Sequence, residues 1–246
     1  MIRRAAEAIK RSKTAIAFTG AGISVESGIP DFRSAGGLWE KYDPAIYASI
    51  DTFRTQPERC WEMIFDTLEL TYAAKPNPGH IALAELEEMG YLKAVITQNI
   101  DNLHQRGGSK RVIEYHGNSI KLVCLKCSSE FNMDDYDRKD RIPPRCEKCD
   151  AILKPSIIFF GEMIPHNALY ESSDLANIAD VVIVAGTSAV VYPAAAIPDT
   201  AKRNGAYIIE SNVEKTAFTN RITDVFLQGP SGARLPELVE AVRELS

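Results

Sequence analysis

Six short apolar runs, rich in β-branched residues, recur along the chain and alternate with helical patterns. They occupy residues 14–19, 93–97, 112–115, 181–185, 207–210 and 224–227. Continuous apolar runs of this length are typical of strands that are buried on both faces. The pattern therefore predicts an α/β protein in which helices cover both faces of a parallel sheet.

Helical periodicity is clearest at residues 82–89, at residues 234–245 and at the N-terminus, where Ile2, Ala5, Ala6 and Ile9 share one face. No apolar run approaches the roughly 18 to 20 residues that a membrane-spanning helix needs. The N-terminal segment also lacks the apolar stretch of a signal peptide. We therefore expect a cytoplasmic protein that does not interact with membranes.

Small and hydrogen-bonding residues follow five of the predicted strands. These segments are Gly20-Ala21-Gly22, Gln98-Asn99-Ile100-Asp101, His116-Gly117, Gly186-Thr187-Ser188 and Ser211-Asn212. In an open α/β sheet, the ligand crevice lies outside the carboxyl ends of the strands. The pattern predicts a nucleotide-like ligand that touches several of these loops at once.

Two stretches depart from the alternation of strands and helices. Residues 32–75 are rich in aromatic side chains and look helical, and residues 119–155 contain four of the five cysteines. We interpret both stretches as insertions that build a smaller second domain, while residues 1–31, 76–118 and 156–246 form the main domain. A cleft between two such domains is a favourable binding site.

The four cysteines form two knuckles, Cys124-x2-Cys127 and Cys146-x2-Cys149, with Cys60 left over. Two such knuckles predict a closed tetrahedral thiolate shell for one structural zinc ion in a reducing compartment. The alternatives are two disulfides or a redox-active CxxC pair.

Charge argues against nucleic acid as the principal partner. The 28 Lys and Arg residues are outnumbered by 33 Asp and Glu residues, which gives a net charge of −5. Residues 120–154, around the cysteines, carry eight basic and seven acidic side chains, so this segment provides no basic patch. We expect no direct nucleic-acid binding.

The loop after the first strand, Gly20-Ala-Gly-Ile-Ser-Val25, begins like a dinucleotide-binding fingerprint, but Val25 stands where a third glycine is expected. Glycines allow a diphosphate to approach the backbone closely, and a following helix start adds partial positive charge. A simple strand-to-helix turn explains these glycines equally well. The continuation Asp31-Phe32-Arg33 is unusually rich in functional groups for a loop.

Several ordered motifs resemble those of the sirtuins, which are NAD-dependent protein lysine deacylases. The similarity extends from about residue 13 to residue 232. The motifs are Gly20-Ala-Gly-Ile-Ser-x-x-Ser-Gly-Ile-Pro-Asp-Phe-Arg33, Pro76-Asn-x-x-His80, Thr97-Gln-Asn-Ile-Asp-Asn-Leu-His104, His116-Gly117, the two CxxC knuckles, Phe160-Gly-Glu162, Gly186-Thr-Ser188 and Tyr192-Pro-Ala194.

The resemblance implies a Rossmann-like domain with a smaller inserted domain, made of a helical module and a four-cysteine zinc ribbon. It also implies a reaction that consumes NAD, removes an acyl group from lysine and yields nicotinamide and O-acyl-ADP-ribose. In this reaction His116 would be the general base that accepts a proton from a ribose hydroxyl. His80 and His104 are better candidates for structural roles.

The resemblance further assigns binding residues. Those for NAD are Gly20, Ala21, Gly22, Ile23, Asp31, Phe32, Arg33, Gln98, Asn99, Ile100, Asp101, Gly186, Thr187, Ser188, Asn212, Val213 and Ser231. Those for an acetylated peptide, bound as an added strand, are Ile158, Phe160, Gly161, Glu162, Val190 and Val191. Ile158 and Phe160 would line the tunnel for the lysine, although both could equally belong to the core.

One departure from the family pattern bears on the choice of acyl group. Sirtuins that prefer succinyl or malonyl lysine carry a Tyr-x-x-Arg pair in the helical module, and the matching positions here are Ile64 and Thr67. A buried negative acyl group would have no partner, which is costly. We therefore predict that the chain acts on acetyl or other neutral acyl groups.

Three other functions are alternatives to deacylation. The first is a protein ADP-ribosyltransferase on the same fold, and the second is a zinc-ribbon binding module without catalysis. A dehydrogenase is disfavoured by the broken glycine fingerprint.

Overall fold

A computed structural model describes residues 1–32 and 37–245. Its largest element is a six-stranded parallel sheet with the strand order β3-β2-β1-β7-β8-β9. The strands are β3 (Val112–Glu114), β2 (Leu92–Thr97), β1 (Ala15–Thr19), β7 (Val181–Ala185), β8 (Tyr207–Asn212) and β9 (Val225–Gln228). All six predicted strands are present, which confirms the α/β class.

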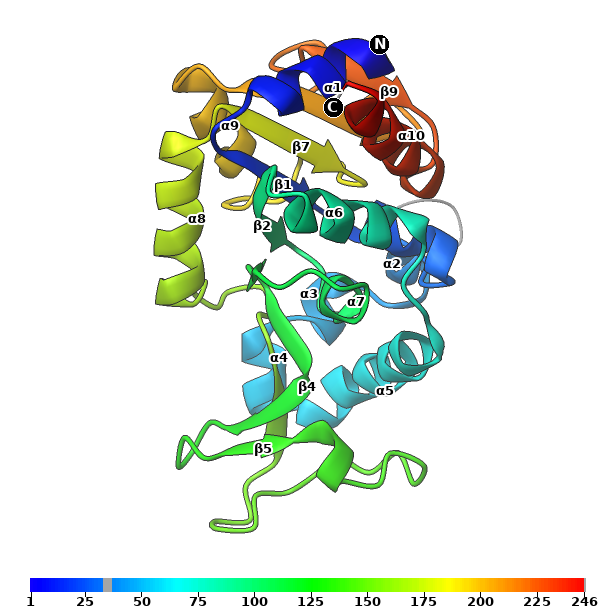
Figure 1. Cartoon of the computed structure of the whole chain (residues 1–246). Helices are drawn as coiled ribbons and strands as arrows, with labels where there is room; N and C mark the ends of the chain where they lie inside the picture. Colours follow the sequence, from blue (N-terminus) through cyan, green and yellow to red (C-terminus); the bar gives the residue numbers. More distant parts are fainter. Residues whose placement is uncertain (33–36, 246) are drawn as a thin grey trace.

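Helices cover both faces of this sheet, as Figure 1 shows. One face carries α1 (Ile2–Arg11), α6 (Pro78–Glu88) and α10 (Ser231–Glu244), and the other carries α8 (His166–Ile178) and α9 (Ala196–Arg203). Among the described residues, no helix is both long and apolar enough to cross a membrane.

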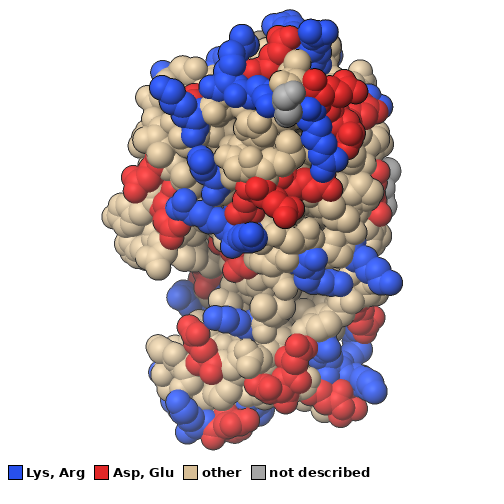
Figure 2. All heavy atoms as spheres, in the orientation of Figure 1, with Lys and Arg blue, Asp and Glu red and all other residues tan. Residues whose placement is uncertain are grey.

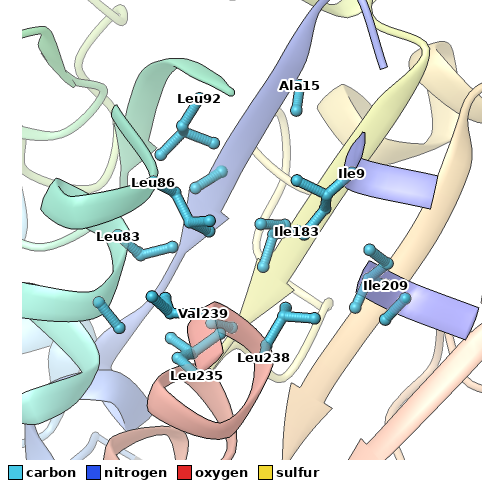
Figure 3. Packing of buried hydrophobic residues seen from close by; sticks show 14 of the residues in the cluster. Ile9, Ala15, Leu83, Leu86, Leu92, Ile183, Ile209, Leu235, Leu238 and Val239 are labelled. Carbon is cyan, nitrogen blue, oxygen red and sulfur yellow. The ribbon is translucent and has the colours of Figure 1, made fainter. Parts of the chain in front are cut away.

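Strand β1 shows how both faces of the sheet are buried. All five of its residues are buried. Because side chains alternate along a strand, Ala15 and Ala17 pack into the cluster with α1, α6 and α10, whereas Ile16 and Phe18 pack into the opposite cluster. Figure 3 shows Ile183 of β7 and Leu238 of α10 within the first of these clusters.

A smaller region, below the sheet in Figure 1, combines helices with a short antiparallel sheet. Its helices are α2 (Leu38–Lys41), α3 (Pro44–Tyr47), α4 (Ile50–Thr55) and α5 (Pro57–Ala73). Its strands are β4 (Gly117–Cys124), β5 (Glu130–Asn132) and β6 (Leu153–Ile157), with the 3-10 turn η2 (Met133–Asp135) after β5. A shared core joins the helices to the sheet, and the indole N–H of Trp61 donates to the Leu153 carbonyl at 3.0 Å.

Two local details differ from the sequence pattern. The segment after β1 is a 3-10 helix, η1 (Ala21–Ser27), and not the start of an α-helix. Strands β4 and β6 also run across residues 118 and 155, where we expected domain boundaries. The exact boundaries therefore stay a prediction.

Candidate active site

A cavity of about 510 Å³ lies at the carboxyl ends of the parallel strands, between the sheet and the smaller region. It is lined by loops after β1, β2, β3, β7 and β8, by the segment after β6, and by α5. Twenty of the predicted site residues line it: Gly20, Ala21, Gly22, Asp31, Phe32, Gln98, Asn99, Ile100, Asp101, His116, Ile158, Phe160, Gly161, Glu162, Gly186, Thr187, Ser188, Val191, Asn212 and Val213.

The loops after β1 and β7 approach each other too closely for side chains. The Gly22 N–H donates to the Gly186 carbonyl at 2.8 Å. A Cβ added at Gly22 would lie 2.8 Å from the Gly186 Cα, and one at Gly186 would lie 2.1 Å from the Ile23 nitrogen. Gly186 also has φ +62°, which favours glycine. These glycines leave backbone, rather than side chains, facing the cavity, as a bound diphosphate requires.

Amide side chains from the loop after β2 tie the other loops together. The Gln98 amide donates to the Thr187 hydroxyl at 3.0 Å. The Asn99 amide donates to the Gly20 carbonyl and to the Ser24 hydroxyl, each at 3.1 Å. These bonds fix the relative positions of three neighbouring loops before any ligand binds.

Ser24 and Asp101 form a buried pair at the floor of the cavity. The Ser24 hydroxyl donates to one Asp101 carboxylate oxygen at 2.6 Å, and the Leu103 N–H donates to the other at 2.9 Å. The ring of His80 lies 3.4 Å from the same hydroxyl. The sequence alone does not indicate a role for Ser24, although its place in the glycine motif is a signal that could have found it.

His116 follows β3 and is half enclosed by the cavity. Its Nδ1 lies 3.2 Å from the Gln98 carbonyl oxygen, which can only accept a hydrogen bond. Nδ1 therefore carries a proton, and in the neutral ring Nε2 is left as the proton acceptor. Burial lowers the pKa of His116, while the bond to the Gln98 carbonyl opposes that effect. A neutral ring with a free acceptor nitrogen is the state that a general base requires.

The other two histidines of this region are buried in helices, His80 at the start of α6 and His104 in the short helix α7 (Leu103–Arg106). The rings of His80 and His104 meet edge to face with centroids 4.9 Å apart. Burial lowers the pKa of His80 to about 4 and that of His104 well below its usual value. His80 also closes the capping box of α6 with Asn77. Their positions agree with the expected structural role.

An aromatic wall closes the cavity beside the loop after η1. Phe32 stacks on Trp39 with ring centroids 4.8 Å apart. The ring centroids of Trp39 and Phe160 are 6.3 Å apart. Such a wall excludes water from the adjoining space. Trp39 had not been assigned to the site from the sequence.

The segment 158–162 is paired to both regions of the molecule. The Phe160 N–H donates to the Ala48 carbonyl at 2.8 Å, and the Phe160 carbonyl accepts from the Ile50 N–H at 3.0 Å. The Ile158 N–H donates to the carbonyl of His116 at 2.9 Å. The predicted peptide-binding segment is therefore held directly against the residue predicted to be the base.

Three predicted residues among those described are not brought to the cavity wall. The side chain of Ile23 is fully buried in the core beneath the sheet, so only its backbone faces the glycine loops. Ser231 is buried at the start of α10, and Val190 is exposed beside the lining residue Val191. Arg33 lies outside the described residues.

The far end of the cavity runs along one face of α5. Met63, Thr67, Leu70 and Thr71 line it. The hydroxyls of Thr67 and Thr71 donate to the carbonyls of Met63 and Thr67 at 2.8 and 2.7 Å. Ile64 is instead buried in the core of the smaller region. Among the described lining residues, Lys215 is the one Lys or Arg, and it follows β8 rather than lying on α5.

The four cysteines of the two knuckles converge at the end of the small sheet. Their Sγ atoms all lie within 4.8 Å of one another, with Cys124 and Cys149 3.4 Å apart and Cys127 and Cys146 3.5 Å apart. All four are free thiols. Tetrahedral ligands at about 2.3 Å from a zinc ion are roughly 3.8 Å apart. The cluster therefore fits one structural zinc ion, whose four coordination positions it would fill.

The sheet order, the glycine loops and the cysteine cluster define a class of protein: a Rossmann-type dinucleotide-binding fold with an inserted zinc-ribbon region. Residues 20–193 match the model of the Sir2 family. The chain belongs to the Sir2 family.

Individual relatives agree with this assignment. An NAD-dependent protein deacylase of Pyrococcus furiosus is 47% identical over 250 residues, which cover 100% of both chains. A solved Sir2 enzyme structure superposes with a TM-score of 0.93 at 48% identity, covering 100% of this chain and 98% of that one. A Sir2 protein solved with a deacetylated p53 peptide and 3'-O-acetyl-ADP-ribose has a TM-score of 0.92 at 37% identity, with 97% of each chain covered.

Proposed function

We propose that this chain is an NAD-dependent protein lysine deacetylase, which transfers the acyl group of a modified lysine to ADP-ribose. With NAD and one water consumed, its products are the free lysine, nicotinamide and O-acetyl-ADP-ribose. The observation that carries the proposal is His116, whose free Nε2 borders the cavity between the glycine loops and the segment 158–162. The relatives named as deacylases support it.

The glycine loops after β1 and β7 would hold the diphosphate, because their mutual packing excludes side chains there. Thr187 and Asn212 would hold the ribose groups, and Asn99 with Asp101 would hold the nicotinamide amide. NAD supplies an electrophilic ribose carbon once its nicotinamide bond breaks. Phe32 and Trp39 keep water from that carbon, which favours acyl transfer over hydrolysis.

His116 would accept a proton at Nε2 from a ribose hydroxyl and so make the hydroxyl oxygen nucleophilic. The Gln98 carbonyl keeps the ring in the required tautomer. The peptide that carries the acyl-lysine would bind as an added strand between the Phe160-Gly161-Glu162 loop and the loop that contains Val190 and Val191, so that backbone hydrogen bonds provide affinity with little demand on sequence.

Neutral acyl groups fit the far end of the cavity best. Thr67 and Thr71 satisfy their hydroxyls on helix carbonyls, so neither hydroxyl proton is available to an acyl carboxylate. We expect acetyl peptide to be turned over much faster than succinyl peptide. In Thr67→Arg the ratio of kcat/KM for succinyl to acetyl peptide should rise by at least about tenfold, since a new charge-assisted bond is worth about 1.5–3 kcal/mol. An unchanged ratio would contradict this role for α5.

Related expectations accompany this function. We place the protein in the cytoplasm, where the free thiols of the zinc cluster stay reduced.

No direct nucleic-acid binding is proposed, because Lys and Arg are interspersed with Asp and Glu on the face shown in Figure 2. The alternative activity on the same site is protein ADP-ribosylation, in which the acyl group stays on lysine.

The decisive experiment measures nicotinamide release and peptide mass together, using an acetyl-lysine peptide with and without NAD. Wild type should release one nicotinamide for each acetyl group removed. His116→Ala should be inactive, while the matched control His166→Ala, which changes an exposed histidine of α8, should behave as wild type. Nicotinamide release with acetyl retained and ADP-ribose on protein would favour the transferase. NAD binding without turnover would favour a binding module.

The same assay gives a pH profile for the base. His116 acts only when neutral, and burial lowers its pKa below 6.5. The acid limb of log kcat/KM should therefore have its midpoint below pH 6.5. A midpoint above that value would contradict the assigned environment of His116.

A further inference from the structure

Lys154 is a buried cation in the strand that leads from the cysteine cluster to the segment 158–162, and no sequence motif indicates a role for it. It is 2% exposed and belongs to β6, the strand that follows the second cysteine knuckle. Among the described residues, few charged side chains are buried so completely, and a buried charge is costly unless its partners compensate. Its partners therefore indicate what it does.

Three hydrogen bonds use the three ammonium protons of Lys154. Nζ donates to the Ile157 carbonyl at 2.6 Å, to the Pro155 carbonyl at 3.2 Å and to the Glu162 carboxylate at 3.0 Å. The ammonium also lies 4.6 Å from the centre of the Phe159 ring. One side chain thus joins the end of β6 to the far side of the segment 158–162.

Glu162, at the other end of the segment 158–162, binds both Lys154 and the backbone of Phe159. The carboxylate oxygen that accepts from Lys154 also accepts from the Phe159 N–H at 2.7 Å, and the Glu162 N–H donates to the Phe159 carbonyl at 3.0 Å. These bonds close residues 159–162 into a tight turn. Within the turn, Phe160 and Gly161 line the cavity.

We propose that Lys154 is a positioning residue, which through Glu162 holds the segment 158–162 in the shape that binds the acyl-lysine peptide. This inference rests on the proposed function, because it assumes that the segment binds the peptide. It changes the role expected for Glu162, whose carboxylate supports the turn instead of contacting the peptide. It also gives the cysteine cluster a direct connection to the segment, since β6 follows the second knuckle and contains Lys154.

The first test separates peptide binding from dinucleotide binding. In Lys154→Met the aliphatic stem remains but the charge and all three hydrogen bonds are lost. The KM for acetyl peptide should rise by about tenfold or more, as expected from losing hydrogen bonds to a charged group, while the KM for NAD changes by less than about twofold. Lys139→Met, which changes an exposed lysine of the ribbon, is the matched control and should leave both values unchanged.

The second test does not depend on activity. Hydrogen exchange should show that the Phe159 amide, which donates to the Glu162 carboxylate, exchanges at least about tenfold faster in Lys154→Met, because Lys154 no longer holds that carboxylate in place. The amides of β1 and β7 should keep their wild-type rates. Glu162→Gln keeps a carbonyl acceptor and should show a smaller effect of the same kind.

The outcomes distinguish failure of the proposed function from failure of the positioning role of Lys154. If wild type does not deacetylate, the proposed function fails, and the exchange rates alone decide the role of Lys154. If wild type is active but Lys154→Met keeps its peptide KM and its exchange rates, the positioning role is wrong. If the KM values for peptide and NAD rise together, Lys154 stabilises the fold generally, and the specific proposal is also overturned.

Discussion

The parallel sheet and the smaller region maintain their structures by different means. In the sheet, β1 and β7 are buried at every residue, and apolar clusters cover both faces. In the smaller region the strands are short and partly exposed, and the core contains three of the cysteines of the metal cluster within or beside it. The first region relies on hydrophobic burial, whereas the second combines a modest core with a metal site and polar links.

This difference explains why apolar residues stabilise the large region, whereas metal ligands and charged residues stabilise the smaller one. The large region can place polar loops at one edge of its sheet because its apolar interior already stabilises it. The smaller region covers those loops and contributes the acyl end of the cavity, but it depends on connections that a chelator or a change in charge can break. Four experiments test the contrast, beginning with the largest expected effect.

Removal of zinc should produce the largest difference in stability between the two regions. Structural zinc sites have apparent binding free energies of about 10–16 kcal/mol in small zinc peptides, so Cys146→Ser or a strong chelator should unfold β4 to β6 and abolish deacetylation. Hydrogen exchange should show protection lost in those strands and kept in β1 and β7. Cys60→Ala, at the one cysteine outside the cluster, should retain zinc. Equal loss of protection in both sheets would contradict the contrast.

Truncation of one buried apolar residue in each region should produce unequal effects. Ile183→Ala in β7 should lower the global free energy of unfolding by about 2–5 kcal/mol, because both sheet faces depend on that strand. Leu122→Ala in β4, an equally buried residue, should mainly increase local opening of the smaller region while zinc is bound. Denaturant unfolding and hydrogen exchange measure the two effects. A larger global effect for Leu122→Ala would reverse the interpretation.

Acid should weaken the large region through its buried histidines. The pKa of His80 is lowered to about 4 by burial, and that of His104 is also lowered. The unfolded chain then binds more protons than the folded chain below pH 6.5, so stability is fully present above pH 6.5 and falls as the pH approaches 4. Between pH 6.5 and 4 we expect the free energy of unfolding to fall by about 2 kcal/mol or more. The decrease should be smaller in His80→Asn. A flat profile would contradict the buried neutral state.

A charge cluster in the smaller region should give the smallest effect. Burial alone would raise the pKa of Asp66, but hydrogen bonds from Lys41, Tyr42 and Arg141 outweigh it and lower the pKa to about 2. This stabilisation is present above pH 3.8 and is lost as the pH falls toward 2. Because the cluster is partly exposed, Asp66→Asn should cost only about 1 kcal/mol at neutral pH. Thermal unfolding measures the cost, and high salt should reduce it.

The sequence predicted the large region well because its signals are local. The six buried strands are continuous apolar runs, and the polar residues that follow them meet at one edge of the sheet by the geometry of parallel strands. The cysteine spacing likewise predicted a cluster, which the four Sγ atoms form. The helices α8 and α9 and the short strand β5 carry weaker patterns, and we did not predict them.

The features that were missed depend on partners far apart in the chain. Ser24 acquires its environment from Asp101 and His80, and Lys154 from a turn that only the folded chain creates. The burial of Ile23 could not be predicted from its motif either. It lies in a motif that faces the cavity, but the tight 3-10 geometry of η1 turns its side chain into the core.

The pairing of β4 with β6 begins where the chain leaves the large sheet. Gly117 lies opposite Ile157, and the next residue, Ile158, donates its N–H to the His116 carbonyl. Backbone pairing, and not a flexible side chain, therefore sets the spacing between the residue predicted to be the base and the first residue of the predicted peptide segment.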